Sequence, residues 1–346
     1  MPKTERARSG KRPPPVLVTG GTGFLGQHLV HLLREDNDAG PLRVLSTASS
    51  MELSEKGIDC IEGSVTSEHD VARALEGIRQ VYHLAGRVSR NPDDQRLLYD
   101  VHVEGTRLLC RAAARAGVER VVMASTSGTI AVTEDGDRVH DETAPPPLEI
   151  IGRWPYYTSK LYQEEVARQE CEGGPELVIL NPSLLLGPGD DRLSSTQDIL
   201  RFLSGDIPVI PPGGLSFVDV RDVAPAFLAA MRGGRSGERY LLGGPNCTFE
   251  KLFGRLERLS KVRAPKLRLP EPLFVWAGKA MDSFYETIRR TPPVDKTSVE
   301  MSRYFWYVDS AKAKAELGFR ARDPYETLYD TVSYIQKQFL GQRVFS

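Results

Sequence analysis

The 346-residue sequence has almost no net charge, few cysteines and no long apolar run. Its 45 basic and 46 acidic residues give a net charge of −1, so no overall positive field would concentrate nucleic acid or an anionic membrane. Cys60, Cys110, Cys171 and Cys247 are far apart and show no C-x-x-C spacing, which indicates neither a zinc site nor a disulfide framework. We therefore expect a protein of the reducing cytoplasm, with no nucleic-acid partner and no bound metal.

No apolar run approaches the roughly 18 residues of a membrane-spanning helix. Residues 1–14 are basic and rich in proline but lack the apolar core of a secretory signal, so we interpret them as a disordered tail. The most apolar stretch, residues 273–285, is interrupted by Lys279 and Asp282 and predicts an amphipathic helix that packs on its own core. A peripheral membrane contact is the alternative there.

From residue 16 onward, short apolar runs alternate with amphipathic segments, which is typical of a parallel sheet with crossover helices. The predicted strands are 16–19, 43–46, 59–62, 81–84, 120–124 and 177–180. The predicted helices are 24–34, 69–75, 103–116 with Gly117 as its stop, and 156–171. The sequence therefore predicts an α/β fold with a doubly wound parallel sheet of the Rossmann type.

After residue 182 the periodicity gives way to loops rich in proline and glycine. We expect a dinucleotide-binding unit over 15–182 and a smaller mixed substrate lid over 183–214 and 244–346. Part of the chain near 215–243 would return to the first unit, with 217–220 and 240–242 as candidates for the edge of its sheet. Because α/β sheets bind ligands outside the carboxyl ends of their strands, the lid would select the substrate.

A glycine turn follows the first predicted strand. Gly20, Gly23 and Gly26 have the spacing G-x-x-G-x-x-G between a strand and a helix. In that context the first glycine permits a tight turn, the second lets the backbone approach a pyrophosphate, and the third lets the helix pack closely on the strand. The turn therefore predicts a dinucleotide site.

The end of the second predicted strand carries neither the acid that selects NAD nor an arginine that would accommodate the phosphate of NADP. It has Ser46, Thr47, Ser49 and Ser50, whose hydroxyls can bond a phosphate and do not repel it. We therefore favour NADP over NAD. Arg43 is interpreted as a surface residue, with a swing toward the phosphate as the alternative.

Tyr156 and Lys160 are four residues apart at the start of a predicted helix, so both side chains emerge on one face. A free tyrosine has a pKa near 10, and the positive charge of Lys160, with that of an oxidised nicotinamide, would bring that pKa nearer to neutral. The fifth predicted strand ends in a run of hydroxyls at 125–129, one of which could hold a substrate oxygen. The pattern predicts proton transfer beside a nicotinamide.

These motifs together resemble the extended short-chain dehydrogenase/reductases, the NAD-dependent epimerase/dehydratase family, over nearly all of the chain beyond the tail. Within it the chain is most similar to the branch of dihydroflavonol 4-reductase, 3β-hydroxysteroid dehydrogenases and hopanoid-associated epimerase-like proteins. The motifs that carry the resemblance are Thr19-Gly20-Gly21-Thr22-Gly23-Phe24-Leu25-Gly26, His83-Leu84-Ala85, Val103-Glu104-Gly105-Thr106, the Tyr156 and Lys160 pair, Asn181-Pro182-Ser183, Gly187-Pro188-Gly189-Asp190, and the stretches 217–224 and 237–244.

The resemblance implies that Tyr156 is the catalytic acid/base, that Lys160 holds the nicotinamide ribose and that Thr126 is the third catalytic residue. The cofactor contacts that we expect are Gly20, Thr22, Gly23, Phe24, Leu25, Gly26, Thr47, Ser64, Val65, Leu84, Ala85, Tyr156, Lys160 and Pro182.

The sequence departs from the family pattern at three places. Gly63-Ser64 stands where the family has Gly-Asp, His102 stands where it has asparagine before Val-x-Gly-Thr, and the third departure is the Ser/Thr stretch after the second strand. We interpret His102 as a structural hydrogen-bonding residue rather than a proton relay.

The resulting hypothesis is reversible hydride transfer between NADP(H), or NAD(H), and a ketone or secondary alcohol on a fairly apolar molecule, sterol-, flavonoid- or polyketide-like. The rival is nucleotide-sugar epimerisation or dehydration with retained NAD. Residues 129–132 (Thr-Ile-Ala-Val) would line the crevice with apolar groups where sugar-nucleotide members have Tyr-Gly, which favours the former. A non-catalytic cofactor-sensing module is the alternative of another class.

The residues leave the oligomeric state open, and the resemblance implies a homodimer paired through helices 103–116 and 156–171.

Overall fold

The structure is a computed structural model that describes residues 13–48, 50–270, 272–274, 276–278, 280 and 295–341. Nearly all of the predicted tail over 1–14 lies outside the described residues, as do Ser49 and about half of the predicted helix over 273–285. The described residues at 273, 274, 276–278 and 280 are helical. Within the described part of the chain, no helix has the length and apolarity needed to cross a bilayer.

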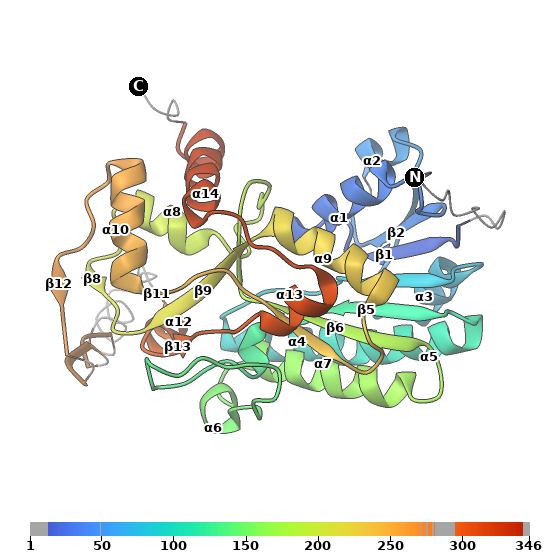
Figure 1. Cartoon of the computed structure of the whole chain (residues 1–346), viewed down its shortest axis with the longest axis horizontal. Coiled ribbons are helices and arrows are strands. Elements are labelled where there is room, and N and C mark those ends of the chain that lie inside the picture. The colour runs from blue at the N-terminus through green and yellow to red at the C-terminus, as the bar shows by residue number, and fades with distance from the viewer. Residues whose placement is uncertain are drawn as a thin grey trace, which may run out of the picture.

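A seven-stranded parallel sheet forms the centre of the molecule (Figure 1), in the order β10-β6-β5-β4-β1-β2-β3. Its strands are β1 (Val16–Thr19), β2 (Leu42–Ser46), β3 (Asp59–Glu62), β4 (Gln80–His83), β5 (Arg120–Ala124), β6 (Glu176–Pro182) and β10 (Arg239–Leu242). The predicted α/β doubly wound fold is confirmed. Because β1 lies between β2 and β4, the strand order reverses there, and a crevice opens at the carboxyl ends of these strands.

Both faces of this sheet are buried, and successive side chains of β1 enter different cores. Val16 and Val18 pack with α1 (Phe24–Glu35) and α9 (Val220–Gly233), whereas Leu17 packs with α3 (Glu68–Leu75), α5 (Gly105–Ala116) and α7 (Pro155–Cys171). In Figure 1, α1 and α9 lie above the sheet and α5 and α7 below it. Strands buried on both faces read as continuous apolar runs, which is why the sequence revealed them.

The predicted helix over 103–116 is the end of a longer helical run. The chain is already helical through η1 (Pro92–Asp94), α4 (Gln95–Tyr99) and the π-turn η2 (Asp100–Glu104) before α5 begins. Gly117 ends α5 in the left-handed region with φ +71°, as predicted for its stop. Three further short helices are α2 (Met51–Glu55), η3 (Ser127–Thr129) and α6 (Leu148–Ile151).

A second, mixed sheet forms the base of the lid. In it β9 (Gly214–Asp219) pairs with β7 (Leu184–Leu186), β11 (Asn246–Thr248) and β13 (Phe305–Trp306). The prediction that 240–242 joins the edge of the main sheet is confirmed by β10. The same prediction for 217–220 was wrong, because residues 217–219 lie in β9 and Val220 begins α9. Strand pairing is a non-local choice, and an apolar run is equally suited to either sheet.

The lid has a hydrophobic core of its own, which includes Phe202, Phe217, Phe253, Leu256 and Leu328. Its remaining elements are β8 (Val209–Ile210), β12 (Leu267–Arg268), α8 (Gln197–Leu203), α10 (Phe249–Ser260), α12 (Lys296–Met301) and α14 (Pro324–Phe339). Helix α13 (Ala311–Leu317) packs instead on α9 and β10 of the main sheet unit. The domain boundaries after residues 14, 182, 214 and 243 stay a prediction.

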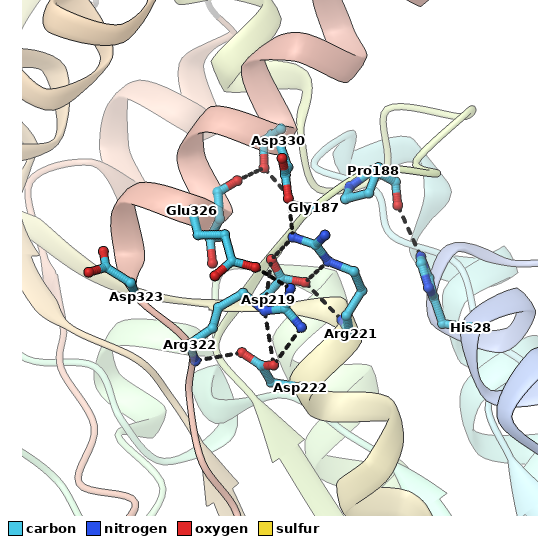
Figure 2. A network of polar contacts seen from close by, with 12 residues as sticks. His28, Gly187, Pro188, Asp219, Arg221, Asp222, Arg322, Asp323, Glu326 and Asp330 are labelled. Atoms are coloured by element: carbon cyan, nitrogen blue, oxygen red, sulfur yellow. Dashed lines mark hydrogen bonds and ion pairs between the residues drawn. The ribbon is translucent and has the colours of Figure 1, made fainter.

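A cluster of ion pairs ties the lid to the dinucleotide-binding unit (Figure 2). Asp219 is 1% exposed, caps α9, and receives two hydrogen bonds from the guanidinium of Arg221 at 2.7 and 2.8 Å. Arg221 also pairs with Asp330 of α14 at 2.7 Å. Arg322, just before α14, lies 3.6 Å from Asp219 and 2.9 Å from Asp222. These pairs hold α14 against the first turn of α9, so the lid has a fixed position over the crevice.

Candidate active site

A cavity of about 1070 Å³ lies between the carboxyl ends of the main strands and the lid. The predicted residues that line it are Gly20, Thr22, Gly23, Phe24, Leu25, Gly26, Leu84, Thr126, Tyr156, Lys160 and Pro182. The structure therefore brings all three predicted catalytic residues and most of the predicted cofactor contacts to one cavity.

The glycine turn at the end of β1 has no room for a side chain at two of its positions. Gly20 has φ +72°, and a Cβ on it would lie 2.8 Å from the backbone of Leu84 and Ala85 at the end of β4. A Cβ on Gly26 would lie 2.1 Å from the carbonyl oxygen of Gly20. Helix α1 begins directly after Gly23, so its first amides face the cavity. Such an N-terminus is suited to an anionic group such as a pyrophosphate.

Tyr156 and Lys160 emerge from the first turns of α7, and Thr126 follows β5 across the cavity. Burial raises the pKa of the Tyr156 hydroxyl, and the neighbouring Tyr157 raises it further. The Lys160 ammonium donates hydrogen bonds to the carbonyl of Ala124 at 2.7 Å and to Gln163, and the lowering of the Tyr156 pKa by Lys160 together with an oxidised nicotinamide stays a prediction. Tyr156 therefore holds its proton at neutral pH.

Lys160 itself is 5% exposed, and burial lowers its pKa to about 8, against a smaller opposing effect of the Glu164 carboxylate. A buried amine loses its proton more easily because the low-dielectric surroundings disfavour its charge. At neutral pH the ammonium form still predominates, and it can present a charge to the cavity.

A chain of buried hydrogen bonds runs from Lys160 to the glycine turn. Lys160 donates to Gln163 Oε1 at 2.5 Å, and Gln163 Nε2 donates to Thr106 Oγ1 at 2.9 Å. Thr106 bonds His83 Nε2, and His83 Nδ1 bonds Thr19 Oγ1, each at 2.8 Å. Burial, with a smaller contribution from Lys160, lowers the pKa of His83 to about 3, so the ring is neutral. The chain couples α7, α5, β4 and β1, and it fixes the position of the lysine.

Sequence reasoning assigned no role to Gln163, although its spacing of three from Lys160 on one helix face could have indicated a contact. It also assigned none to Glu164, which is 1% exposed and lies under the site. The Glu164 carboxylate accepts hydrogen bonds from Thr129 at 3.1 Å and Asn181 at 2.7 Å, and it pairs with Arg239 at 2.8 Å. The polar sequence around Glu164 gave no signal of its burial.

His102 lines the cavity but is held as a neutral structural residue. Its Nε2 accepts a hydrogen bond from the backbone N–H of Arg87 at 3.1 Å, so the ring proton lies on Nδ1. Nδ1 bonds Ser159 Oγ at 2.8 Å, and Ser159 donates to the carbonyl of Tyr156, also at 2.8 Å. Burial, followed by the charge of Lys160, lowers the pKa of His102 well below its ordinary value. These contacts support the structural interpretation.

A smaller pocket of about 320 Å³ lies beside the end of β2 and shares Thr22 with the main cavity. Ser46 bonds Thr22 through their hydroxyls at 2.8 Å, and Ser50 caps α2. Arg43 lies near the other end of β2 and pairs with Asp59 at 2.6 Å, so its predicted alternative of turning to a phosphate is not supported.

Four of the residues that we expected to contact the cofactor line neither the main cavity nor the smaller pocket. Thr47 is exposed, and Ser64 bonds Thr66 and Asp70 in a surface turn. Val65 is buried in the core against the position of Gly105, and Ala85 packs against the glycine turn.

One wall of the cavity is aromatic. Trp154 stacks on Trp306 with ring centroids 5.6 Å apart, and Tyr157 lies 5.0 Å from both Trp306 and Tyr156. The prediction that residues 129–132 line the crevice was wrong. Their apolar members are at most 2% exposed and fill internal clusters, because the turn η3 directs the chain into the core.

A polar group closes the lid end of the cavity. The Arg90 guanidinium donates two hydrogen bonds to Asp198 of α8, at 2.7 and 3.1 Å, and one to Ser298 of α12 at 2.8 Å. These residues all line the cavity. The bonds join the loop after β4 to two lid helices, so this end of the cavity offers charged partners next to an aromatic wall.

The comparisons with known proteins agree with this geometry. Residues 16–243 match the model of the NAD dependent epimerase/dehydratase family. The chain belongs to that family, and it is an oxidoreductase. The resemblance inferred from the sequence motifs is confirmed.

Among its relatives is a putative dihydroflavonol 4-reductase of Synechocystis sp., 34% identical over 327 residues that cover 92% of this chain and 94% of the relative. Sterol demethylase protein B of Methylococcus capsulatus is 31% identical over 325 residues, 93% of this chain and 98% of the relative. The solved structure of gox2253 is 28% identical, covers 94% of this chain and 99% of that one, and has a TM-score of 0.80.

Proposed function

We propose that this oxidoreductase interconverts a ketone and a secondary alcohol on a fairly apolar small molecule that is sterol-, flavonoid- or polyketide-like. The observation that carries the proposal is the aromatic wall of Trp154, Tyr157 and Trp306 next to Tyr156. Flat aromatic faces favour fused rings over a hydrated sugar. The relatives named for dihydroflavonol and sterol reactions support the same substrate class.

The residues fit a nicotinamide dinucleotide. The close backbone approach at Gly20 and Gly26 and the N-terminus of α1 suit the pyrophosphate, while Lys160 would hold the nicotinamide ribose. Leu84 and Pro182 supply apolar contacts on the cavity wall. When bound, the cofactor supplies or accepts the hydride.

Tyr156 performs the proton transfer. Because burial keeps its hydroxyl protonated, it can donate a proton to the substrate oxygen as the ketone is reduced. Thr126, on the same cavity, orients that oxygen. With an oxidised nicotinamide bound, its positive charge together with that of Lys160 would favour the phenolate that the reverse reaction needs.

We propose NADP rather than NAD as the cofactor, on the hydroxyls that follow β2. Ser46, Ser50 and Thr22 surround the small pocket there, but Glu55 and Glu62 also line it, and a carboxylate repels a phosphate. The ratio of the two affinities is therefore measured first.

The assembly and location that accompany this function are also proposals. Four free cysteines in the described chain are consistent with the cytoplasm. Helices α5 and α7 pack side by side below the sheet, and they would form the interface of a homodimer.

The test begins with fluorescence titrations of NADPH and NADH. A panel of apolar ketones and of nucleotide sugars is then added while the absorbance of the reduced nicotinamide is followed. We expect stoichiometric oxidation with a ketone. Conversion of a nucleotide sugar without net oxidation would replace the proposal with the epimerase or dehydratase reaction, and binding of neither cofactor would overturn both.

The variant that tests the mechanism is Tyr156→Phe. We expect kcat to fall by about 10²- to 10⁴-fold, the range typical of a lost general acid, with the affinity for the cofactor unchanged. The matched control is Tyr162→Phe on the same helix, which is 53% exposed and should keep full activity. Equal activity of the two variants would contradict the role of Tyr156.

A further inference from the structure

The tip of the lid around β12 exposes large apolar side chains. Leu267 is 53% exposed, Leu273 46% and Trp276 66%. Scattered exposed apolar residues need no explanation, but three within ten positions of one segment form a patch. Figure 1 shows β12 and β8 at the end of the molecule opposite to α2 and α3.

The same tip is strongly basic, although the whole chain has a net charge of −1. Residues 261–278 contain four Lys and Arg and one acid, Glu271. Arg268 pairs with Glu250 of α10, while Lys261, Arg263 and Lys266 are exposed beside the apolar patch. The local charge is therefore opposite to that of an anionic surface.

The segment also faces the active-site cavity from its other side. Leu269, Phe274 and Ala277 line the cavity, and Phe274 is 7% exposed. Side chains of one segment thus reach both solvent and the cavity. The tip is the place where an apolar molecule could pass between the cavity and an external apolar phase.

We propose that this tip, residues 261–278 as far as they are described, docks on the surface of an anionic lipid bilayer. Exposed tryptophan and leucine insert at the boundary between headgroups and acyl chains, and adjacent basic side chains bind anionic headgroups. Passage of substrate from the bilayer into the cavity rests on the apolar substrate proposed above. The docking itself does not, and it is measured without turnover.

The test is sedimentation of the full chain with vesicles of phosphatidylcholine alone or mixed with phosphatidylglycerol. We expect binding to the anionic vesicles, weakened by salt, and weak binding to the neutral ones. Lys261→Gln with Lys266→Gln should lower the partition coefficient about 25-fold, since each cation near such a surface contributes about fivefold. The control Lys314→Gln, an exposed lysine of α13, should have no effect.

The apolar contribution is tested separately. Trp276→Ser should lower the partition coefficient at least about tenfold, whereas Leu148→Ser, a control 58% exposed on α6, should not. Tryptophan emission of the wild type should shift to the blue on anionic vesicles, and Trp276→Phe should abolish the shift.

Two results would overturn the proposal. The first is no binding to anionic vesicles, or binding that the patch variants leave unchanged. The second is concentration-dependent self-association that Trp276→Ser abolishes without any vesicle binding, which would make the patch an interface between copies of this chain. Since cofactor binding and ketone reduction are assayed without lipid, either proposal can fail alone.

Discussion

Replacing Lys160 by methionine should remove a defined part of the pH dependence of stability. Lys160 is buried, and its pKa of about 8 lies below its ordinary value of 10.5. The folded protein therefore releases this proton at a lower pH than the unfolded chain does. Between these two pKa values the unfolded state binds more protons, so the free energy of unfolding rises with pH.

The magnitude follows from the two pKa values. From pH 7 to pH 9.5 the wild type should gain about 2 kcal/mol from this one group. This contribution of Lys160 to the free energy of unfolding is complete above the pKa that Lys160 has in the unfolded chain, and it is lost as the pH falls through about 8. Below that value the charged amine is retained in the core at a cost in stability, which a proton-transfer site requires.

The assay is urea unfolding of wild type and Lys160→Met at both pH values. The quantity compared is the gain in free energy of unfolding from pH 7 to pH 9.5, in the wild type minus that in the variant. Other lysines and tyrosines that titrate over this range cancel in it. A value near zero, or a larger gain in the variant, would refute the argument that burial depresses this pKa. If the methionine variant folds poorly, Lys160→Arg serves in its place, because arginine stays charged throughout.

Three further predictions follow from the site. Gly26→Ala should abolish cofactor binding in a fluorescence titration, because its Cβ would lie 2.1 Å from the Gly20 carbonyl oxygen; retained affinity would show that the turn can move. Glu164→Gln should lower the free energy of unfolding by about 3 kcal/mol in urea, since it leaves Arg239 without its buried partner, and a loss no larger than that of the exposed Glu165→Gln would contradict this. His102→Gln should leave the pH profile of kcat between pH 5.5 and 7.5 unchanged, because burial lowers the pKa of the ring and its Nε2 accepts a hydrogen bond from Arg87; loss of an acidic limb would indicate that His102 titrates during catalysis.

The strands of the main sheet were predictable because a strand that is buried on both faces has a sequence of consecutive apolar residues. Six of the seven were located within two residues of their observed bounds, and the seventh, β10, was named as an edge candidate. The assignment of 217–220 failed because β9 is equally apolar and only its partners decide which sheet it joins. Likewise, residues 129–132 were expected at the crevice because they follow the catalytic hydroxyls, and the turn η3 buries them instead.

The sequence by itself determined the alternation of strands and helices, the glycine turn, and the placement of Tyr156 and Lys160 one turn apart on one helix. Each of these depends on spacings of a few residues, which local backbone geometry converts directly into a shape. Only the tertiary structure decided that Lys160 is bonded to the carbonyl of Ala124, and that an aromatic wall faces Tyr156. Those properties arise from burial and from contacts between distant segments, and neither the dielectric around a side chain nor its partners across the fold can be inferred from local spacing.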